Sequence, residues 1–291
     1  MQILTHRGLD PDIPKFPSES SVEAFQQHIK RGYGLECDLN FTADDQIAIH
    51  HDSTIARLTN QQDSRPIREM SFKELQHIFT KNTHHTLCTI EDIATLIGQS
   101  RATIHAFHFK GLLQQGKNID ILIAEFKKYS KLFDRMLLFD LLPDIASYIK
   151  RELQTIHLAP SVAHPYDKQR FNNLVSGTLL TVDEAIQKRN IFDWVWLDEW
   201  DRKDANNTEK TFYTRDVFDE LKKVKYSIGL VTPELHATSP GLIERESHED
   251  AIDTLRLFQR ITEIMMLQPD ALCTDHPDKC KEIYDSIYLT V

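Results

Sequence analysis

The sequence predicts an α/β fold, a single (β/α)₈ TIM barrel, and three observations support this fold class. Short runs of β-branched and aromatic residues alternate with amphipathic helical segments from the first residue to the last, as in parallel α/β proteins. Eight of these runs qualify as strands. The length of 291 residues suits one such barrel. Because no repeat, low-complexity stretch or linker interrupts the alternation, we expect residues 1–291 to form one domain.

Each element is expected from its own pattern of apolar residues. The expected strands cover residues 1–5, 34–40, 102–110, 136–140, 155–159, 194–198, 226–231 and 271–274, and residues 46–50 return beside the second strand. Amphipathic periodicity predicts helices over residues 21–31, 71–79, 89–97, 118–129, 144–152, 181–188, 214–224 and 249–266.

Capping signals mark two of these helix starts. Ser20 or Ser21 precedes Glu23, and Thr89 precedes Glu91. In each case a side-chain oxygen can accept a hydrogen bond from a free backbone N–H group of the first turn, and a carboxylate lies near the positive end of the helix dipole. Two polar segments, residues 201–211 and 236–249, follow strands. We expect them as loops over the C-terminal face of the barrel, where barrel enzymes keep their active sites.

Composition excludes several classes of protein. No apolar run approaches the roughly 18 residues that a membrane span needs, and the chain starts without an export signal, so a cytoplasmic protein without stable membrane association is expected. The four cysteines show no CxxC pairing, which favours free thiols, with Cys37 and Cys273 as packing residues. A net charge of −10 argues against nucleic acid as a partner. An anionic substrate would therefore need cations of its own within the site.

Polar residues gather at the ends of the first three strands and their connections. Such residues are costly inside a barrel unless they are paired or bind something. They are His6 and Arg7 after the first strand, Glu36 and Asp38 in the second, His51 and Asp52 after the return strand, and His108 and Lys110 in the third.

Strand periodicity predicts where the acidic pair points. Alternation places Leu35, Cys37 and Leu39 on one face of the second strand, and Glu36 with Asp38 on the other, toward the barrel interior. Two adjacent buried carboxylates repel each other, and a divalent cation such as Mg²⁺, Mn²⁺ or Ca²⁺ would relieve the repulsion. The alternative is an acid pair neutralised by the neighbouring basic side chains.

His108 and Lys110 share the interior face of the third strand, because alternate residues point the same way. A neutral imidazole at His108 could complete the metal shell, and Lys110 could neutralise a phosphate oxygen. A histidine in a strand can equally be a hydrogen-bonded core residue, so both readings stay open.

Six short motifs occur in order in the first third of the chain. They are HRG at residues 6–8, ESSVEAF at 19–25, ECD at 36–38, TADD at 42–45, HD at 51–52 and RLT at 57–59, and an apolar strand followed by TDHPD at 274–278 closes the chain. In order and spacing this set resembles the glycerophosphodiester phosphodiesterases, a family of metal-dependent TIM barrels. Residues 112–225 resemble the family only weakly.

The resemblance implies roles for individual residues. His6 and His51 would be the catalytic acid/base pair, Glu36 and Asp38 metal ligands, and Arg7 and Lys110 cations that contact the phosphate. Glu19 would either support these groups from behind or lie next to the metal, and Asp52 would support them without touching the metal. The chain departs from the family at His108, which stands where the family usually has a third, glutamate ligand, and its later motifs match a less typical branch.

Two strands later in the chain carry candidate substrate contacts. Glu199 and Trp200 follow the sixth strand and Glu234 follows the seventh, where an aromatic ring could stack on a glycerol or sugar headgroup. Barrel packing for the tryptophans and solvated loop positions for the glutamates are the plainer alternatives. The expected activity is hydrolysis of a small-molecule phosphodiester. A lyase-like release of a cyclic phosphate and a binding protein with weak activity remain as alternatives.

Overall fold

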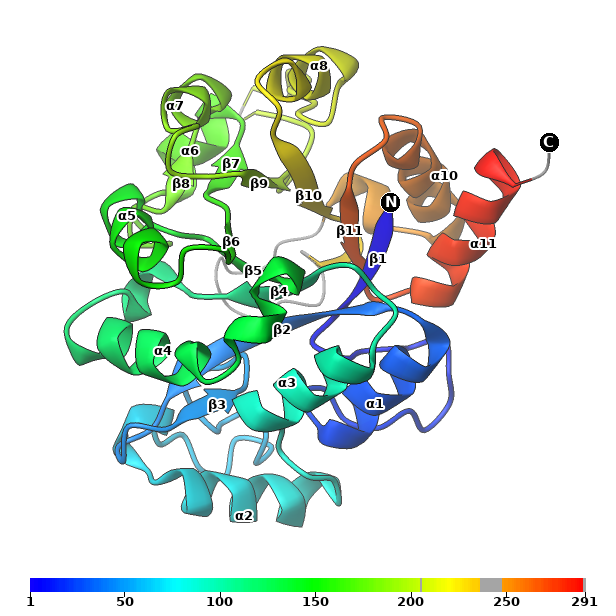
Figure 1. Cartoon of the computed structure of the whole chain (residues 1–291). Helices are drawn as coiled ribbons and strands as arrows, with labels where there is room; N and C mark the ends of the chain where they lie inside the picture. Colours follow the sequence, from blue (N-terminus) through cyan, green and yellow to red (C-terminus); the bar gives the residue numbers. More distant parts are fainter. Residues whose placement is uncertain (205, 236–247, 290–291) are drawn as a thin grey trace.

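Parallel strands form the inner wall of a (β/α)₈ barrel in the computed structural model, which describes residues 1–204, 206–235 and 248–289 (Figure 1). The hydrogen-bonded order is β6-β5-β4-β2-β1-β11-β10-β9-β7-β8, so the first strand lies between the second and the last. The strands are β1 (Gln2–His6), β2 (Gly34–Phe41), β3 (Ile47–Ile49), β4 (His105–His108), β5 (Met136–Phe139), β6 (His157–Leu158), β7 (Ser161–Ala163), β8 (Leu179–Leu180), β9 (Trp194–Asp198), β10 (Ser227–Val231) and β11 (Ala271–Thr274).

Residues 157–163 close the barrel between β5 and β9. Ala159 N donates to Leu138 O on one side (2.9 Å), and Trp196 N donates to Pro160 O on the other (3.0 Å). The single strand expected over residues 155–159 is instead two short strands, β6 and β7, because Pro160 has no N–H to contribute to a ladder. β7 also pairs with β8, a strand that the sequence pattern did not predict.

Helices surround the strands in an outer ring, and Figure 1 shows α2 and β3 outside that ring. The helices are α1 (Val22–Arg31), α2 (Phe72–Thr83), α3 (Ile90–Gln99), α4 (Lys117–Lys127), α5 (Pro143–Glu152), α6 (Pro165–Phe171), α7 (Val182–Gln187), α8 (Arg215–Lys223), α10 (Thr254–Met265) and α11 (Pro277–Tyr288). In the described part of the chain, 3₁₀ turns accompany them: η1 (Ile67–Glu69), η2 (Gly111–Leu113), η3 (Ser130–Arg135) and η4 (Glu249–Ala251). The expected helices are present, although η4 forms the start of the one expected over 249–266, while α6 and α11 were not predicted.

Both predicted capping signals are confirmed. Ser21, rather than Ser20, caps α1 by accepting a hydrogen bond from Ala24 N (3.1 Å). Thr89 and Asp92 form a reciprocal capping box at the start of α3. These bonds satisfy N–H groups that the first helical turn leaves without partners.

The hydrophobic core lies mainly between the strands and the helices, as the alternation in β2 predicted. Leu35, Cys37 and Leu39 are buried there, in one cluster with Phe25 and Ile29 of α1. A smaller cluster, which includes Cys273, fills the barrel interior. All four cysteines are buried free thiols, as expected, and burial raises their pKa values.

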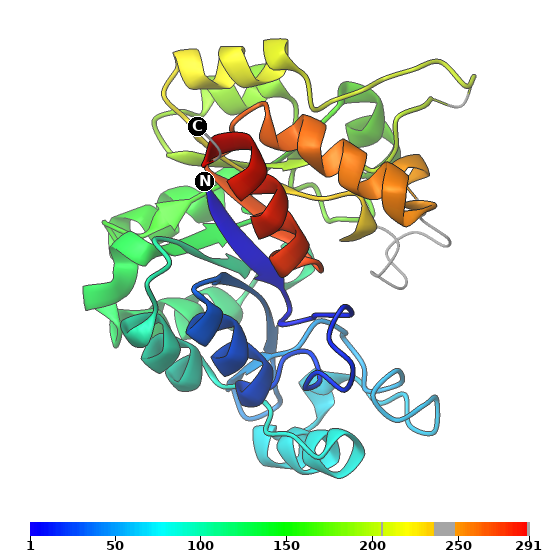
Figure 2. The ribbon, with the colours of Figure 1, turned by 90° about the vertical axis from the view of Figure 1, so that its right-hand side faces the viewer.

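The connections after the strands project from one end of the barrel. In Figure 2 the segment that follows β3 and the segment that follows β9 extend to the same side, at the carboxyl ends of the strands. Most of the expected loop over residues 236–249 lies outside the described residues. Within the described residues, no helix combines the length and the apolar character that crossing a membrane requires.

Candidate active site

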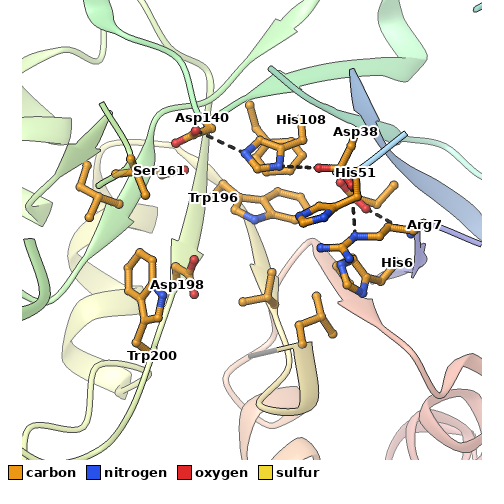
Figure 3. Close-up of a pocket in the computed structure, with 17 residues that line it drawn as sticks. His6, Arg7, Asp38, His51, His108, Asp140, Ser161, Trp196, Asp198 and Trp200 are labelled. Atoms are coloured by element: carbon orange, nitrogen blue, oxygen red, sulfur yellow. Dashed lines mark hydrogen bonds and ion pairs between the residues drawn. The ribbon is translucent and has the colours of Figure 1, made fainter. Parts of the chain in front are cut away.

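A cavity of about 110 Å³ opens among the carboxyl ends of the strands. Figure 3 shows side chains from β1, β2, β4 and β9, and Asp140 directly after β5, directed into it. Its lining consists of His6, Arg7, Glu36, Asp38, His51, His108, Phe139, Asp140, Ser161, Val175, Leu179, Trp196, Asp198, Trp200, Val231, Leu235 and Cys273. The residues that the sequence assigned to the acid/base pair and to the metal therefore meet in one cavity.

The predicted acid pair is buried in the wall of this cavity, as strand alternation indicated. Arg7 contacts both carboxylates: its backbone N donates to Glu36 Oε2 (3.2 Å), and its Nε lies 3.1 Å from Asp38 Oδ2. Arg7 itself is in a left-handed conformation (φ 55°), which turns the chain sharply at the end of β1 and brings this guanidinium into the barrel.

The two carboxyl groups differ in their electrostatic surroundings. Burial raises the pKa of Glu36, and the nearby charge of Asp38 raises it further. Burial would also raise the pKa of Asp38, but Lys110, His51 and Arg7 outweigh it and hold this pKa well below its usual range. Lys110 Nζ lies 3.2 Å from Asp38 Oδ1 and donates to His51 O (2.5 Å). Asp38 is therefore the anion on which the cations of the site converge.

His108 lies between two carboxylates. Its Nδ1 donates to Asp38 Oδ1 (3.0 Å) and its Nε2 to Asp140 Oδ2 (3.3 Å), while its ring stacks on Phe139 at 4.7 Å between centroids. Burial lowers the pKa of this imidazole, but the two hydrogen bonds prevail and raise the pKa to about 9. Trp196 stacks on the other side of Phe139 (4.1 Å), so the aromatic wall fixes the plane of the histidine ring.

His51 is oriented by a chain of hydrogen-bonded side chains. Its Nδ1 donates to Asp52 Oδ1 (2.7 Å), Asp52 Oδ2 accepts from Arg57 Nε (2.7 Å), and Arg57 also pairs with Glu19. Burial lowers the pKa of His51 to about 3. Asp52 thus holds His51 directly, and Glu19 is linked to it through Arg57. His50 does not line the cavity, and its Nδ1 is bonded to Asp52 O (3.2 Å).

His6 is oriented in the same way by a carboxylate from the far end of the chain. Its Nδ1 donates to Asp275 Oδ1 (2.8 Å), across 269 positions in the sequence. Sequence reasoning assigned no role to Asp275, although this residue belongs to the closing TD motif. Two histidines of the cavity therefore have the same arrangement, with Nδ1 held by a carboxylate.

Glu36, Asp38 and His108 form a group that could hold a metal ion, since one ligand atom from each lies within 4.8 Å of the others. The donor chemistry fits a divalent cation, because two buried carboxylates and an imidazole are ordinary ligands for such an ion. His108 fits only after a proton leaves the nitrogen that would bind the metal.

Two predicted substrate contacts, Glu199 and Glu234, do not line the cavity. Glu199 is buried away from the cavity, where it accepts from Phe212 N (2.5 Å), Tyr213 N (2.9 Å) and Arg260 Nη2 (2.7 Å). Asp198 and Trp200 line the cavity, so strand alternation turns the residue between them outward.

Glu234 is likewise buried without lining the cavity. Its Oε1 accepts from the hydroxyls of Thr232 and Thr274 (both 2.6 Å) and from Asp275 N (3.1 Å). This carboxylate therefore joins the end of β10 to the end of β11. The predicted contact Trp200 does line the cavity, and so does Trp196.

Some cavity residues were missed by the sequence analysis. Asp140 and Asp198 each follow an apolar run, MLLF and WVWL, which is the same signal that identified Glu36 and Asp38. Ser161 follows the interrupting Pro160 and carries no comparable signal. Lys110, predicted beside the phosphate, lines a neighbouring cavity and reaches the first one through Asp38.

The fold and the site together define a (β/α)₈ barrel with a buried acid pair, fixed cations and two oriented histidines at the carboxyl ends of its strands. The model of the glycerophosphoryl diester phosphodiesterase family matches residues 6–192. The chain belongs to this family.

Known proteins similar to the chain agree with this assignment. Glycerophosphodiester phosphodiesterase 1 of Bos taurus is 24% identical over 208 residues, which cover 66% of this chain and 60% of the relative. A Bacillus altitudinis glycerophosphodiester phosphodiesterase is 24% identical over 143 residues, 47% of this chain and 56% of that protein. The chain thus spans less than two thirds of either relative.

Solved structures share the fold at low sequence identity. A glycerophosphoryl diester phosphodiesterase of Parabacteroides distasonis superposes with a TM-score of 0.62 at 16% identity, covering 98% of this chain and 86% of that one. An Oleispira antarctica phosphodiesterase in complex with the product sn-glycerol-3-phosphate superposes with a TM-score of 0.60 at 15% identity, covering 98% and 97%.

Proposed function

We propose that this protein hydrolyses glycerophosphodiesters to an alcohol and a phosphate monoester, with His6 and His51 as the acid/base pair. The observation that carries the proposal is that both imidazoles line one cavity and both bind a carboxylate through Nδ1. This pattern leaves Nε2 of each ring as the atom that exchanges a proton with substrate. Family membership and the product bound by the Oleispira antarctica relative support the substrate class.

In the proposed reaction, water attacks phosphorus while Nε2 of one histidine takes its proton. The bond from phosphorus to the leaving alkoxide breaks, and the other histidine donates a proton to that oxygen. Arg7 and Lys110 balance the charge on the phosphoryl oxygens, which a chain with net charge −10 must otherwise repel.

We propose further that Glu36, Asp38 and His108 bind a divalent cation, which would polarise a phosphoryl oxygen. Mg²⁺, Mn²⁺ and Ca²⁺ all suit the carboxylates, and Mn²⁺ also suits the imidazole. Arg7 would then position the phosphate relative to the acid pair, since it already contacts both carboxylates.

Substitution of either histidine tests the proposal. His6→Ala and His51→Ala should each lower the turnover of glycerophosphocholine by at least about 100-fold, because general acid/base catalysis contributes on that scale. His50→Gln is the matched control, since His50 neighbours His51 in sequence but does not line the cavity. Circular dichroism checks the fold, and phosphorus NMR identifies the product.

The outcomes separate the alternatives. The proposal is supported if the unsubstituted protein forms a phosphate monoester and the His6→Ala and His51→Ala variants do not. A cyclic phosphate as product would instead show attack by a substrate hydroxyl. Full turnover in both histidine variants, or binding of the diester without turnover under Mg²⁺, Mn²⁺ and Ca²⁺, contradicts the proposal.

A further inference from the structure

A second cavity of about 470 Å³ joins the catalytic cavity, and we call it the side groove. His51, His108, Asp140 and Val175 line both cavities, so the two are continuous at the reaction centre. Its volume lies within the range of about 300–1,000 Å³ that is typical of small-molecule sites. A group attached to the phosphodiester can therefore extend from the histidines into the side groove.

The side groove has one apolar and one polar wall. Leu112 and Leu113 of η2, with Leu174 and Val175 from the turn after α6, form the apolar wall. Leu112 is 61% exposed and Leu174 55% exposed, two of the six large hydrophobic side chains exposed in the described part of the chain. Exposed leucines that gather on one cavity mark a binding surface, whereas single ones are ordinary.

The polar wall comes from the segment after β3, which includes Asp52, Thr54 and Arg57. Arg57 is paired with Asp52 and Glu19, and Lys110, which also lines the groove, is paired with Asp38. His51 belongs to both cavities, whereas Leu112, Leu113 and Leu174 line the side groove but not the catalytic cavity. An amphipathic molecule with a phosphodiester at one end fits this arrangement.

The apolar wall is firmly built. The buried side chain of Gln114 donates to Phe109 O (2.5 Å) and Asp140 O (2.6 Å) and accepts from Leu142 N (2.9 Å), which fixes η2 to the ends of β4 and β5. Gly111 packs against the turn that carries Leu174: a Cβ added there would lie 2.5 Å from Val175 O. The hydrogen bonds of Gln114 hold the turn that carries Leu112, and the packing of Gly111 holds the turn that carries Leu174. We therefore expect both leucines to stay exposed in the groove.

We propose that the side groove binds a single hydrocarbon chain carried by the substrate, so that the protein accepts single-chain phosphodiesters of the lysophospholipid class. The inference rests on the proposed function for the position of the phosphodiester group. The chain lies on Leu112, Leu113, Leu174 and Val175, and its polar end faces Lys110 and His51. Burial of methylene groups against these leucines adds affinity that a short glycerophosphodiester lacks.

Binding to the whole protein tests the inference separately from catalysis. The probes are dodecylphosphocholine, below its micelle concentration, and glycerophosphocholine, both measured by titration calorimetry. We expect dodecylphosphocholine to bind at least about tenfold more tightly, and we expect Leu112→Asn with Leu174→Asn to remove most of that preference. Leu255→Asn is the matched control, because Leu255 is 82% exposed and lines neither cavity.

Three results would overturn the inference: equal affinity for the two probes, a preference that survives in the double variant, or an equal loss in Leu255→Asn. A dimer in light scattering that the double variant dissociates would assign the leucines to self-association and overturn it too. Failure of the proposed function gives a different result, the absence of a phosphate monoester from glycerophosphocholine, which calorimetry does not measure.

Discussion

Glu36 and Asp38 are neighbours in β2, but their pKa values are shifted in opposite directions. Asp38 is surrounded by Arg7, Lys110 and His108, which hold its pKa down, whereas burial and Asp38 raise the pKa of Glu36. A buried carboxyl with a raised pKa gains most from a further positive charge. Glu36 is therefore the residue on which cation binding should depend most.

Metal binding can be tested at this residue. Glu36→Gln should weaken Mn²⁺ binding to the metal-free protein by at least about tenfold, because it removes a charged oxygen ligand. Titration calorimetry measures the affinity. Glu234→Gln is the control, since Glu234 is equally buried but does not line the cavity. Unchanged Mn²⁺ affinity in Glu36→Gln would remove Glu36 from the proposed ligand set.

Residue-scale prediction succeeded where alternation was applied inside a strand. Glu36, Asp38 and His108 face the cavity because they occupy interior positions of β2 and β4. The same rule explains why Glu199 does not face the cavity. Trp196, Asp198 and Trp200 point to one side of the chain, and Glu199 points to the other. The partnership of His6 with Asp275 had no local signal, since no pattern within either segment specifies a contact across 269 positions.

At the scale of elements, β2 connects the site to the barrel, because it is hydrogen-bonded to β1 and to β4. Its first residue, Gly34, lies close to both neighbours: an added Cβ would lie 2.4 Å from a Leu4 methyl and 2.6 Å from Ile104 O. Only glycine allows β2 to start at this distance from the adjacent strands.

A pair of glycine substitutions tests this packing. Gly34→Ala should lower the free energy of unfolding by more than about 2 kcal/mol, because a backbone carbonyl has to move. Gly98→Ala in α3 should raise it by up to about 1 kcal/mol, since nothing lies within 4 Å and alanine favours the helix. Urea unfolding measures both. Equal stability of the two variants would show that β2 adjusts its position freely.

At the scale of the whole molecule, a buried ion pair joins β9 to α10, two elements far apart in the sequence. Glu199 at the end of β9 binds Arg260 of α10, and Arg260 also pairs with Glu263. Burial opposes ionisation of Glu199, but the nearby His248 (Nε2 to Oε1, 3.6 Å) and the charge of Arg260 outweigh it and lower its pKa to about 2. This pair replaces the substrate contact that was predicted for Glu199.

The depressed pKa makes stability fall in acid. A carboxyl group whose pKa is lower in the folded state stabilises that state fully at pH values above its pKa in the unfolded chain, 4.5. This contribution is lost as the pH falls toward the folded-state pKa of about 2. Between pH 7 and pH 3 this amounts to about 2 kcal/mol. Glu199→Gln should lack this part of the acid destabilisation, whatever its stability at pH 7, as measured by urea unfolding at each pH.

The exposed Glu220 of α8 provides the control for this measurement. Glu220→Gln should retain the full loss of stability between pH 7 and pH 3, because its side chain is in water in both states. An identical pH profile for Glu199→Gln and the unsubstituted protein would show that the ion pair with Arg260 contributes nothing to acid stability.

Local sequence patterns were enough to predict the alternation of strands and helices, the caps of α1 and α3, and the inward direction of Glu36, Asp38 and His108. These features depend on residues a few positions apart, so periodicity and local hydrogen bonding are enough to specify them. Three other features appear only in the folded chain: residues 157–163 close the barrel, Asp275 orients His6, and Leu112 and Leu174 line the same groove. Those contacts join distant segments, and the packing of the closed barrel alone brings them together.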